Sequence, residues 1–306
     1  MTIKYKILIT GGTGFIGKAL VNELLKDDHQ ITILTRNKKL KNSANLTYLS
    51  SLDDIEFNFD IVINLAGSPI AVNWNDNNKQ EIIESRITTT QKLVDKINNS
   101  KYPVQLFISG SAIGIYGTNP KNQIDKISSE DSEIIIDNNI FSQKLCDDWE
   151  KTALQAQTKT RVVTLRTGIV LGRDGGILKK MLLPFFFGLG AKIGNGKQIM
   201  SWVALEDVIG IIKLIIADQT ITRSINACSA NPVSNHHFSK ALAQSLNRPC
   251  ILTIPEITLK LIYGKMAQEL MIDGQKILPK TAQAHGYKFQ FEKIEDCLAN
   301  IFLNKP

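Results

Sequence analysis

The sequence predicts an α/β protein built on a doubly wound parallel sheet, with a smaller mixed lobe toward its C-terminal end. Short apolar runs alternate with segments whose apolar residues recur every three or four positions, as strands and helices do in βαβ units. The runs contain few polar residues, which is typical of strands covered on both faces. The alternation ends near residue 170, where glycines begin to interrupt the apolar segments.

Six strands are expected in the first part of the chain. The first reads KILIT at residues 6–10; it is apolar, contains β-branched residues and is followed by glycine. The others share this character and cover residues 30–35, 46–50, 59–67, 104–111 and 161–171. Because crossovers between parallel strands are right-handed, the connecting helices should cover both faces of the sheet.

Helices are expected where apolar residues recur at helical spacing, at residues 18–28, 76–99 and 141–157 and, in the second part, at 205–218, 234–246, 255–264 and 293–302. Ser234 is a plausible cap, and a further strand is expected at 224–229. We therefore expect a sheet domain over residues 1–170. A smaller lobe over 171–306, interleaved with the first domain, should pack over the carboxyl ends of the strands, with a C-terminal region from about residue 250.

The overall composition favours a soluble protein with a small anionic ligand. The net charge is +7, and hydrophobic residues make up 43% of the chain. The lysines are scattered, as in residues 35–42, and do not alternate with aromatic residues, so no nucleic-acid partner is expected. The apolar runs are too short to span a bilayer, and no membrane partner is expected.

The four cysteines also limit the possibilities. They lie far apart in the sequence, without a C-x-x-C motif, at Cys146, Cys228, Cys250 and Cys297. Neither a metal site nor a disulfide framework is therefore expected. Isolated thiols, together with a strand pattern that begins within a few residues of the N-terminus, predict a reducing, cytoplasmic location.

The glycine-rich stretch after the first strand predicts a dinucleotide site. In GGTGFIG, Gly11 permits a tight turn, Gly14 lets a diphosphate approach the backbone, and Gly17 lets the helix pack on the strand. The free N–H groups at the helix start would then stabilise the phosphates. The alternative is a glycine-rich turn without a ligand. The predicted fold is thus Rossmann-like, and its cofactor-binding residues at this turn are Gly11, Thr13, Gly14, Phe15, Ile16 and Gly17.

The end of the second strand favours NADP(H) over NAD. NAD-binding proteins usually place a carboxylate there for the ribose hydroxyls, whereas this chain has Thr35 and Arg36. Arg36 could pair with a 2′-phosphate and stack on the adenine. The alternative interpretation is a solvated charge in a loop.

The glycine spacing G-x-x-G-x-x-G resembles that of the extended, sugar-nucleotide epimerase/dehydratase branch of the short-chain dehydrogenase/reductase superfamily. The segment NLAG at residues 64–67 resembles the adenine-side segment of that group and implies contacts from Leu65, Ala66 and Gly67. Nearly the whole chain resembles an atypical subgroup, commonly labelled "epimerase family protein". The similar segments include LAGSPI (65–70), ESRITTTQKLVD (84–95), SGSAIGIYG (109–117) and LRTGIVLGRDGGILKKMLLPF (165–185).

The resemblance implies a catalytic serine after the fifth strand and a Tyr-x-x-x-Lys pair on the next helix, where the lysine lowers the tyrosine pKa. Ser111 falls on the serine position, but Phe141 and Leu145 replace the pair. The atypical subgroup also lacks this pair. Tyr116 is the nearest remaining phenol, so Ser111 and Tyr116 are the candidate catalytic residues. The alternative for Tyr116 is a packed side chain whose hydroxyl bonds to the backbone.

Four more residues are expected at the cofactor or in the cleft: Ser109, Arg86, Arg166 and Thr167. Arg86 stands where the wider superfamily often has an asparagine, and it could reach a cofactor phosphate or a substrate carboxylate. The alternative is an ion pair with Glu81 or Glu84. This chain also has Ala204 where the subgroup usually has histidine and Phe186 where arginine is common. Because neither Ala204 nor Phe186 has a polar side chain, a polar substrate contact at these two positions is not expected.

Three functions stay open at this point. The first is an NADP(H)-dependent oxidoreductase or epimerase that acts on an unidentified small molecule, a sugar nucleotide being one option, through an unusual proton path. The second is an NADP(H) sensor without turnover, and the third is a structural protein that keeps the cofactor for stability. By analogy with the superfamily, a homodimer could form through the helices at 76–99 and 141–157.

Overall fold

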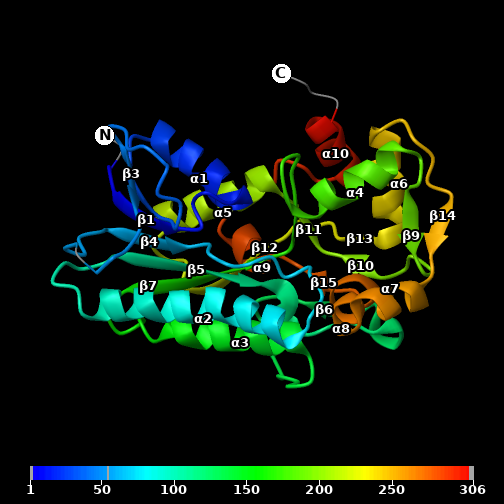
Figure 1. Cartoon of the computed structure of the whole chain (residues 1–306), viewed down its shortest axis with the longest axis horizontal. Helices are drawn as coiled ribbons and strands as arrows, with labels where there is room; N and C mark the ends of the chain where they lie inside the picture. The colour runs from blue at the N-terminus through cyan, green and yellow to red at the C-terminus, as the bar shows by residue number, and fades with distance from the viewer. Residues whose placement is uncertain (1–2, 54, 303–306) are drawn as a thin grey trace.

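The structure is a computed structural model that describes residues 3–53 and 55–302. At its centre lies a seven-stranded sheet in the order β12-β7-β5-β4-β1-β2-β3, in which all neighbouring strands are parallel (Figure 1). Its strands are β1 (Lys6–Thr10), β2 (Gln30–Leu34), β3 (Leu46–Leu49), β4 (Ile61–Asn64), β5 (Leu106–Ala112), β7 (Arg161–Thr167) and β12 (Arg223–Ala227). The strand order reverses between β1 and β4, and open α/β sheets bind their ligands beside the carboxyl ends at such a point.

Helices cover both faces of this sheet, as the sequence predicted. One face packs against α1 (Phe15–Lys26) and α5 (Leu205–Ala217), and the other against α2 (Asp76–Asn98) and α3 (Phe141–Leu154) (Figure 1). Successive residues of a strand point to opposite faces. Ile7 and Ile9 of β1 therefore join the core under α1 and α5, whereas Leu8 joins the core under α2 and α3. The predicted fold class, a doubly wound Rossmann-like sheet, is confirmed.

Part of the chain beyond residue 170 returns to the large sheet. β12 pairs with β7 from Arg223 opposite Val163 to Ala227 opposite Thr167, and α5 packs on α1. The sequence placed this strand in the smaller lobe, so the two parts are more interleaved than expected. The paired residues are sixty positions apart, so no local pattern in the sequence could have revealed this pairing.

The rest of the chain forms a smaller lobe of short helices and two-stranded sheets at one end of the molecule (Figure 1). Its sheets pair β6 (Ile127–Ser128) with β15 (Lys276–Ile277), β8 (Ile169–Leu171) with β11 (Trp202–Ala204), β9 (Ala191–Ile193) with β14 (Leu252–Ile254), and β10 (Ile199–Met200) with β13 (Val233–Ser234). Its helices are α4 (Gly176–Phe186), α6 (Asn235–Ser245), α7 (Glu256–Tyr263), α8 (Lys265–Ala267) and α10 (Ile294–Phe302), whereas α9 (Lys280–Ala284) packs on β12 and places Ala282 in the core of the large sheet. Three further short helices are the 3-10 helices η1 (Ile113–Tyr116) and η2 (Lys121–Gln123) and the π-helix η3 (Gln268–Ile272).

The lobe has its own core and local helix signals. Trp202 and Phe238 are fully buried at its centre. Ser234 caps α6 by accepting a hydrogen bond from the His237 amide, as the sequence predicted. Over residues 3–53 and 55–302, no helix combines the length and the apolar character needed to cross a membrane.

Candidate functional site

The β1–α1 turn has the geometry that the glycines predicted. Gly11 has φ +71°, and a Cβ there would lie 2.5 Å from the Leu65 carbonyl oxygen. A Cβ on Gly17 would lie 2.2 Å from the Gly11 carbonyl oxygen, so the approach of α1 to the turn requires glycine at 17, whereas the positive φ and the close Leu65 segment require glycine at 11. Phe15, the first residue of α1, packs against Gly175 and so ties the turn to the smaller lobe.

Gly14 leaves the start of α1 open. It is the N-cap residue, is exposed, and supplies no side-chain cap, and the first turn of the helix contains no acidic residue. A Cβ at Gly14 would meet only the Gly11 carbonyl oxygen, at 3.1 Å. The first amides of α1, together with the positive end of the helix dipole, therefore face space that a diphosphate could fill. This arrangement fits the cofactor that the sequence predicted.

Arg36 lies in the loop after β2, the strand next to β1. The Asn37 amide donates to Thr35 Oγ1 at 3.2 Å and shapes this loop. Arg36 is exposed, and no ion pair or hydrogen bond of its side chain is found among the described residues. Its charge is thus available on the β2 side of the glycine turn.

Arg86 lies on the opposite side of β1, against the segment that follows β4. It donates to the carbonyl oxygens of Ile82 at 3.2 Å and Ser68 at 3.1 Å, and its Cζ lies 5.3 Å from the centre of the Trp149 ring. A Cβ on Gly67 would lie 3.0 Å from that Cζ atom.

The alternative interpretation of Arg86, an ion pair with Glu81 or Glu84, is not what the structure shows. Glu81 accepts a hydrogen bond from Ser68 Oγ at 2.8 Å, and Glu84 accepts one from the side-chain amide Nε2 of Gln80 at 2.8 Å. Burial lowers the pKa of Arg86, although the guanidinium stays charged at neutral pH. Within the part of the chain that the structure describes, this half-buried cation has no carboxylate partner.

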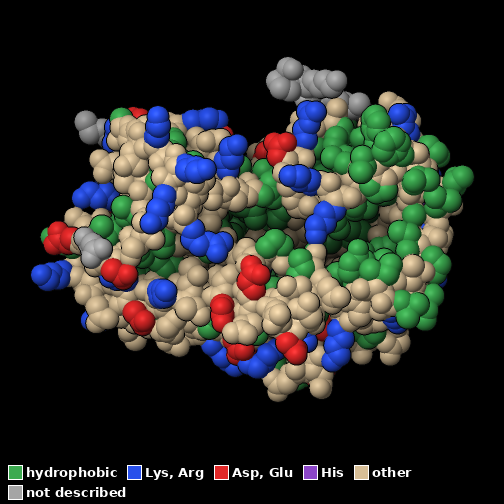
Figure 2. All heavy atoms as spheres, viewed as in Figure 1, with side chains coloured by type: hydrophobic (Ala, Val, Ile, Leu, Met, Phe, Trp, Pro, Cys, Tyr) green, Lys and Arg blue, Asp and Glu red, His purple; other side chains and the backbone are tan. Residues whose placement is uncertain are grey.

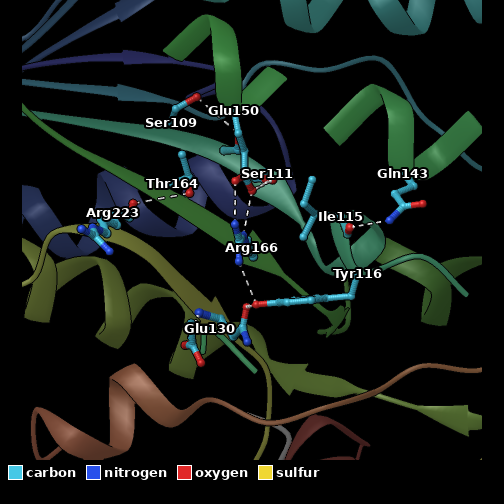
Figure 3. A network of polar contacts seen from close by, with 12 residues as sticks. Ser109, Ser111, Ile115, Tyr116, Glu130, Gln143, Glu150, Thr164, Arg166 and Arg223 are labelled. Carbon is cyan, nitrogen blue, oxygen red and sulfur yellow. Dashed lines mark hydrogen bonds and ion pairs between the residues drawn. The ribbon is translucent and has the colours of Figure 1, made fainter. Parts of the chain in front are cut away.

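Ser111 and Tyr116 belong to a buried polar network between β5, α3 and β7 (Figure 3). Ser111 Oγ donates to Glu150 Oε1 at 2.6 Å, and Arg166 donates to the two oxygens of the same carboxylate at 2.8 and 2.7 Å. Arg166 also donates to the Tyr116 hydroxyl, which in turn donates to Asn226 Oδ1, both at 2.9 Å. All five side chains are buried.

The network controls the ionisation of its members. Burial is the main cause that raises the pKa of Tyr116 to about 12, although the nearby Arg166 guanidinium partly opposes it. Burial also disfavours the charge on Arg166, but hydrogen bonds and charge attraction from Glu150 outweigh it and raise the Arg166 pKa. A phenol with this pKa stays protonated at neutral pH and is a poor general acid or base. The geometry therefore does not favour the catalytic roles predicted for Ser111 and Tyr116.

Two residues that the sequence placed at the cofactor or in the cleft are buried instead. The Arg166 guanidinium donates to Glu150 and Tyr116, and Ser109 is buried and donates to the Gly110 carbonyl oxygen. Thr167 is half-buried and donates to the Ser111 carbonyl oxygen at 3.1 Å. Arg166 and Ser109 are buried because alternate residues of a strand point to the same face of the sheet, and α2 and α3 cover this face up to the strand ends.

The positions of the missing tyrosine and lysine are filled by apolar packing. The Phe141 ring lies 4.7 Å from the Trp74 ring, centre to centre, in an edge-to-face arrangement. Leu145 is buried in the same cluster as Trp74. Lys144, the nearest lysine in sequence, forms an ion pair with Asp148 one turn along α3.

Two residues of this region were not anticipated from the sequence. Glu150 neutralises Arg166, and Asn226 anchors Tyr116 while its own amide N–H donates to Glu130 at 2.8 Å. Glu150 did carry a weak hint, since it is a carboxylate within an amphipathic helix, beside Trp149. Nothing local distinguishes Asn226, because its partners lie more than fifty residues away.

Comparison with known proteins identifies the class. The model of the NAD dependent epimerase/dehydratase family matches residues 7–228, and a domain of unknown function (DUF1731) matches residues 254–301. The chain therefore belongs to the NAD dependent epimerase/dehydratase family, and the resemblance noted in the sequence is confirmed.

The curated relatives span the whole chain. Epimerase family protein YfhF of Bacillus subtilis is 33% identical over 306 residues, 98% of each chain. Epimerase family protein SDR39U1 homolog, chloroplastic, of Arabidopsis thaliana is 34% identical over 307 residues, 96% of this chain and 86% of the relative.

Solved structures agree with this assignment. Human epimerase family protein SDR39U1 (isoform2), solved with NADPH, superposes with a TM-score of 0.86 and 29% identity, over 98% of this chain and 100% of that one. The nucleoside-diphosphate sugar epimerase from Corynebacterium glutamicum gives a TM-score of 0.77 and 28% identity, over 98% of this chain and 59% of that one.

Proposed function

We propose that this protein binds NADP(H) at the carboxyl ends of β1, β2 and β4 and acts as an oxidoreductase or epimerase on a small molecule. The observation that carries the proposal is the open start of α1 at Gly14, together with the exposed Arg36 after the neighbouring strand β2, whose side chain has no ion pair or hydrogen bond among the described residues. The amides suit a diphosphate, and the guanidinium suits a 2′-phosphate. The human relative solved with NADPH supports the same choice of cofactor.

The cofactor preference can be measured by titration calorimetry of the purified protein. We expect NADPH to bind more tightly than NADH. Replacing Arg36 with glutamine should weaken NADPH binding by about ten- to a hundredfold, because one charge-assisted contact to the 2′-phosphate is lost, and should leave NADH binding unchanged. Lys41→Gln, which removes a nearby exposed charge, is the matched control. Equal affinities of the wild type for the two nucleotides would refute the preference.

Arg86 is proposed to hold the other half of the cofactor or an acidic group of the substrate. A dinucleotide spans the point where the strand order reverses, so an adenosine over β2 places the nicotinamide half over β4 and β5. Arg86 contacts the segment after β4 and has no carboxylate partner among the described residues. Arg86 belongs to α2, which packs beside α3, and α3 carries Leu145 at the position where the superfamily resemblance implies a lysine.

The role of Arg86 can be separated from that of Arg36 with a fragment of the cofactor. Adenosine 2′,5′-bisphosphate lacks the nicotinamide half, so Arg86→Gln should weaken NADPH binding by about tenfold and leave this fragment unaffected. Arg36→Gln should weaken both. Arg86→Lys, which keeps the charge, should recover part of the loss. If Arg86→Gln weakened the fragment as much as NADPH, the side chain would act on the adenosine half or on the fold.

The chemistry differs from that of the usual Tyr-x-x-x-Lys enzymes. The bound cofactor would supply or accept a hydride, and this chain would bind and orient the two reactants. Because Ser111 and Tyr116 are buried and bonded within the protein, we propose that the proton comes from ordered water or from the substrate itself. General acid–base catalysis by a positioned phenol typically raises the rate about 10²- to 10⁴-fold, so turnover without it should be slow. A sugar nucleotide is a candidate substrate, since one similar solved protein is named a nucleoside-diphosphate sugar epimerase.

A second candidate function is an NADP(H) sensor without turnover. It is favoured by the apolar packing at Phe141 and Leu145, which leaves the usual proton donors absent. A sensor would bind NADPH but transfer no hydride to any compound that copurifies with it. Mass spectrometry of protein isolated from its own cells would reveal a retained substrate, and absorbance at the reduced nicotinamide band would report its turnover. Two further expectations stay predictions: that the protein is located in the reducing cytoplasm, and that it forms a homodimer through α2 and α3.

A further inference from the structure

One end of the smaller lobe carries most of the exposed hydrophobic side chains. Among the described residues, eleven of the sixteen exposed large hydrophobic side chains fall within residues 183–189 and 251–263. Figure 2 shows hydrophobic side chains gathered over α4, β14 and α7, on the right of the view. Leu261 and Ile251 are 82% and 83% exposed, so they do not contribute to the lobe's core. Exposed apolar patches of this kind mark interaction surfaces.

The two segments form one continuous surface, which we call the apolar end. Arg248 Nε donates to the Phe186 carbonyl oxygen at 2.7 Å, and the Arg248 guanidinium lies 5.2 Å from the Phe186 ring centre. β14 pairs with β9, which follows the first segment directly. α7 is anchored from below by buried Leu259, while Ile257 and Leu261, four residues apart, project outward together.

The segments that contain and flank the apolar end carry more basic than acidic side chains. Residues 176–192 and 248–265 contain six basic side chains, at Lys179, Lys180, Lys192, Arg248, Lys260 and Lys265, against the single carboxylate of Glu256. Glu256 is itself paired with Lys121, at 2.8 Å. These segments therefore account for most of the chain's net charge of +7, and the two signs nearly balance elsewhere.

We propose that the apolar end docks the protein on the surface of an anionic lipid bilayer. Hydrophobic side chains that enter the headgroup boundary, with lysine and arginine around them, are the pattern by which proteins bind such a surface without spanning it. The long aliphatic stems of the lysines can lie along the apolar surface while their charges reach the phosphates. A two-fold contact with a second copy would instead bring the same basic residues close to one another.

This proposal departs from the sequence expectation of no membrane partner, which rested on the absence of a spanning segment. It requires surface contact only. It is also independent of the cofactor, because the residues involved are not those proposed to bind NADP(H).

The test is flotation of the purified full chain with lipid vesicles. We expect binding to vesicles of phosphatidylglycerol and phosphatidylcholine, weakened by high salt, and much weaker binding to pure phosphatidylcholine. Replacing Ile251 and Leu261 with serine should lower the partition coefficient by about tenfold for each side chain. Lys260→Gln and Lys265→Gln should each lower it by about fivefold.

Ile135→Ser is the matched control, because Ile135 is 78% exposed outside the apolar end. It should leave vesicle binding unchanged, and thermal unfolding should show that all these variants remain folded. The proposal is overturned if the wild type does not float with anionic vesicles, or if the Ile251 and Leu261 variants float as well as the wild type. It is also overturned if sedimentation shows a dimer that these serine variants dissociate while vesicle binding is absent.

Discussion

Replacing Glu150 with glutamine should lower the free energy of unfolding by about 3–5 kcal/mol, the usual cost of removing one partner from a buried ion pair. The carboxylate accepts two hydrogen bonds from Arg166 and one from Ser111. A neutral amide would leave the guanidinium buried without a counter-charge, and its own N–H group would oppose one of the arginine donors. Urea denaturation followed by circular dichroism measures the change.

Two further variants make the Glu150 result specific. Asp131 pairs with Lys280 at 3.3 Å, and both side chains are more than half exposed, so Asp131→Asn should change stability by about 1 kcal/mol at most. Replacing Glu150 and Arg166 together with methionine removes both charges and should recover most of the loss. If Glu150→Gln were no more destabilising than Asp131→Asn, the buried pair would not hold β7 to α3 as described.

The β1–α1 turn could be predicted from the sequence because its main determinants are local. Gly11 needs a positive φ, Gly17 needs a close helix approach, and both requirements arise within seven residues of one another. Arg36 could be placed at the end of the second strand because one helix and one strand separate it from the glycines. The same reasoning predicted the long helices, whose apolar faces repeat over several turns.

Arg166 shows where this reasoning stops. It follows a strand pattern, so the sequence placed it at the open edge of the sheet. Whether a side chain near a strand end lies in a cleft or beneath a helix depends on which neighbour faces it, and Glu150 on α3 is that neighbour. A cation is stable in such a place only when a carboxylate neutralises it. The Arg166–Glu150 ion pair is a tertiary contact, and no sequence motif predicts it.

The small lobe was hard to predict for a different reason. β8 pairs with β11, and β9 with β14, across thirty to sixty residues, and each strand has three residues. Three residues are too few to show alternation, so their pairing depends on the packing around them. Gly168 is an example: it separates β7 from β8 within the single strand expected at 161–171, and a Cβ there would lie 2.4 Å from the Ser201 carbonyl oxygen, a contact with a residue 33 positions away.

Replacing Gly14 with valine should weaken NADPH binding by about a hundredfold or more while the protein stays folded. Gly14 has φ −79°, which valine adopts without strain, and a Cβ would meet only the Gly11 carbonyl oxygen at 3.1 Å, a contact that a small shift relieves. The rest of the side chain would occupy the space in front of the first amides of α1. Two charge-assisted hydrogen bonds to a phosphate, each worth about 1.5–3 kcal/mol, would then be lost. Titration calorimetry measures the affinity.

A graded series separates this effect from a loss of fold. Gly14→Ala should weaken NADPH by about tenfold, since a methyl group displaces the diphosphate less than a branched side chain does. Gly17→Ala should instead lower the thermal midpoint, because its Cβ would lie 2.2 Å from the Gly11 carbonyl oxygen. NADPH binding of wild-type strength in the Gly14→Val protein would show that the cofactor does not lie against this turn. The open helix start would then be a structural feature only, and the proposed function would lose the observation that carries it.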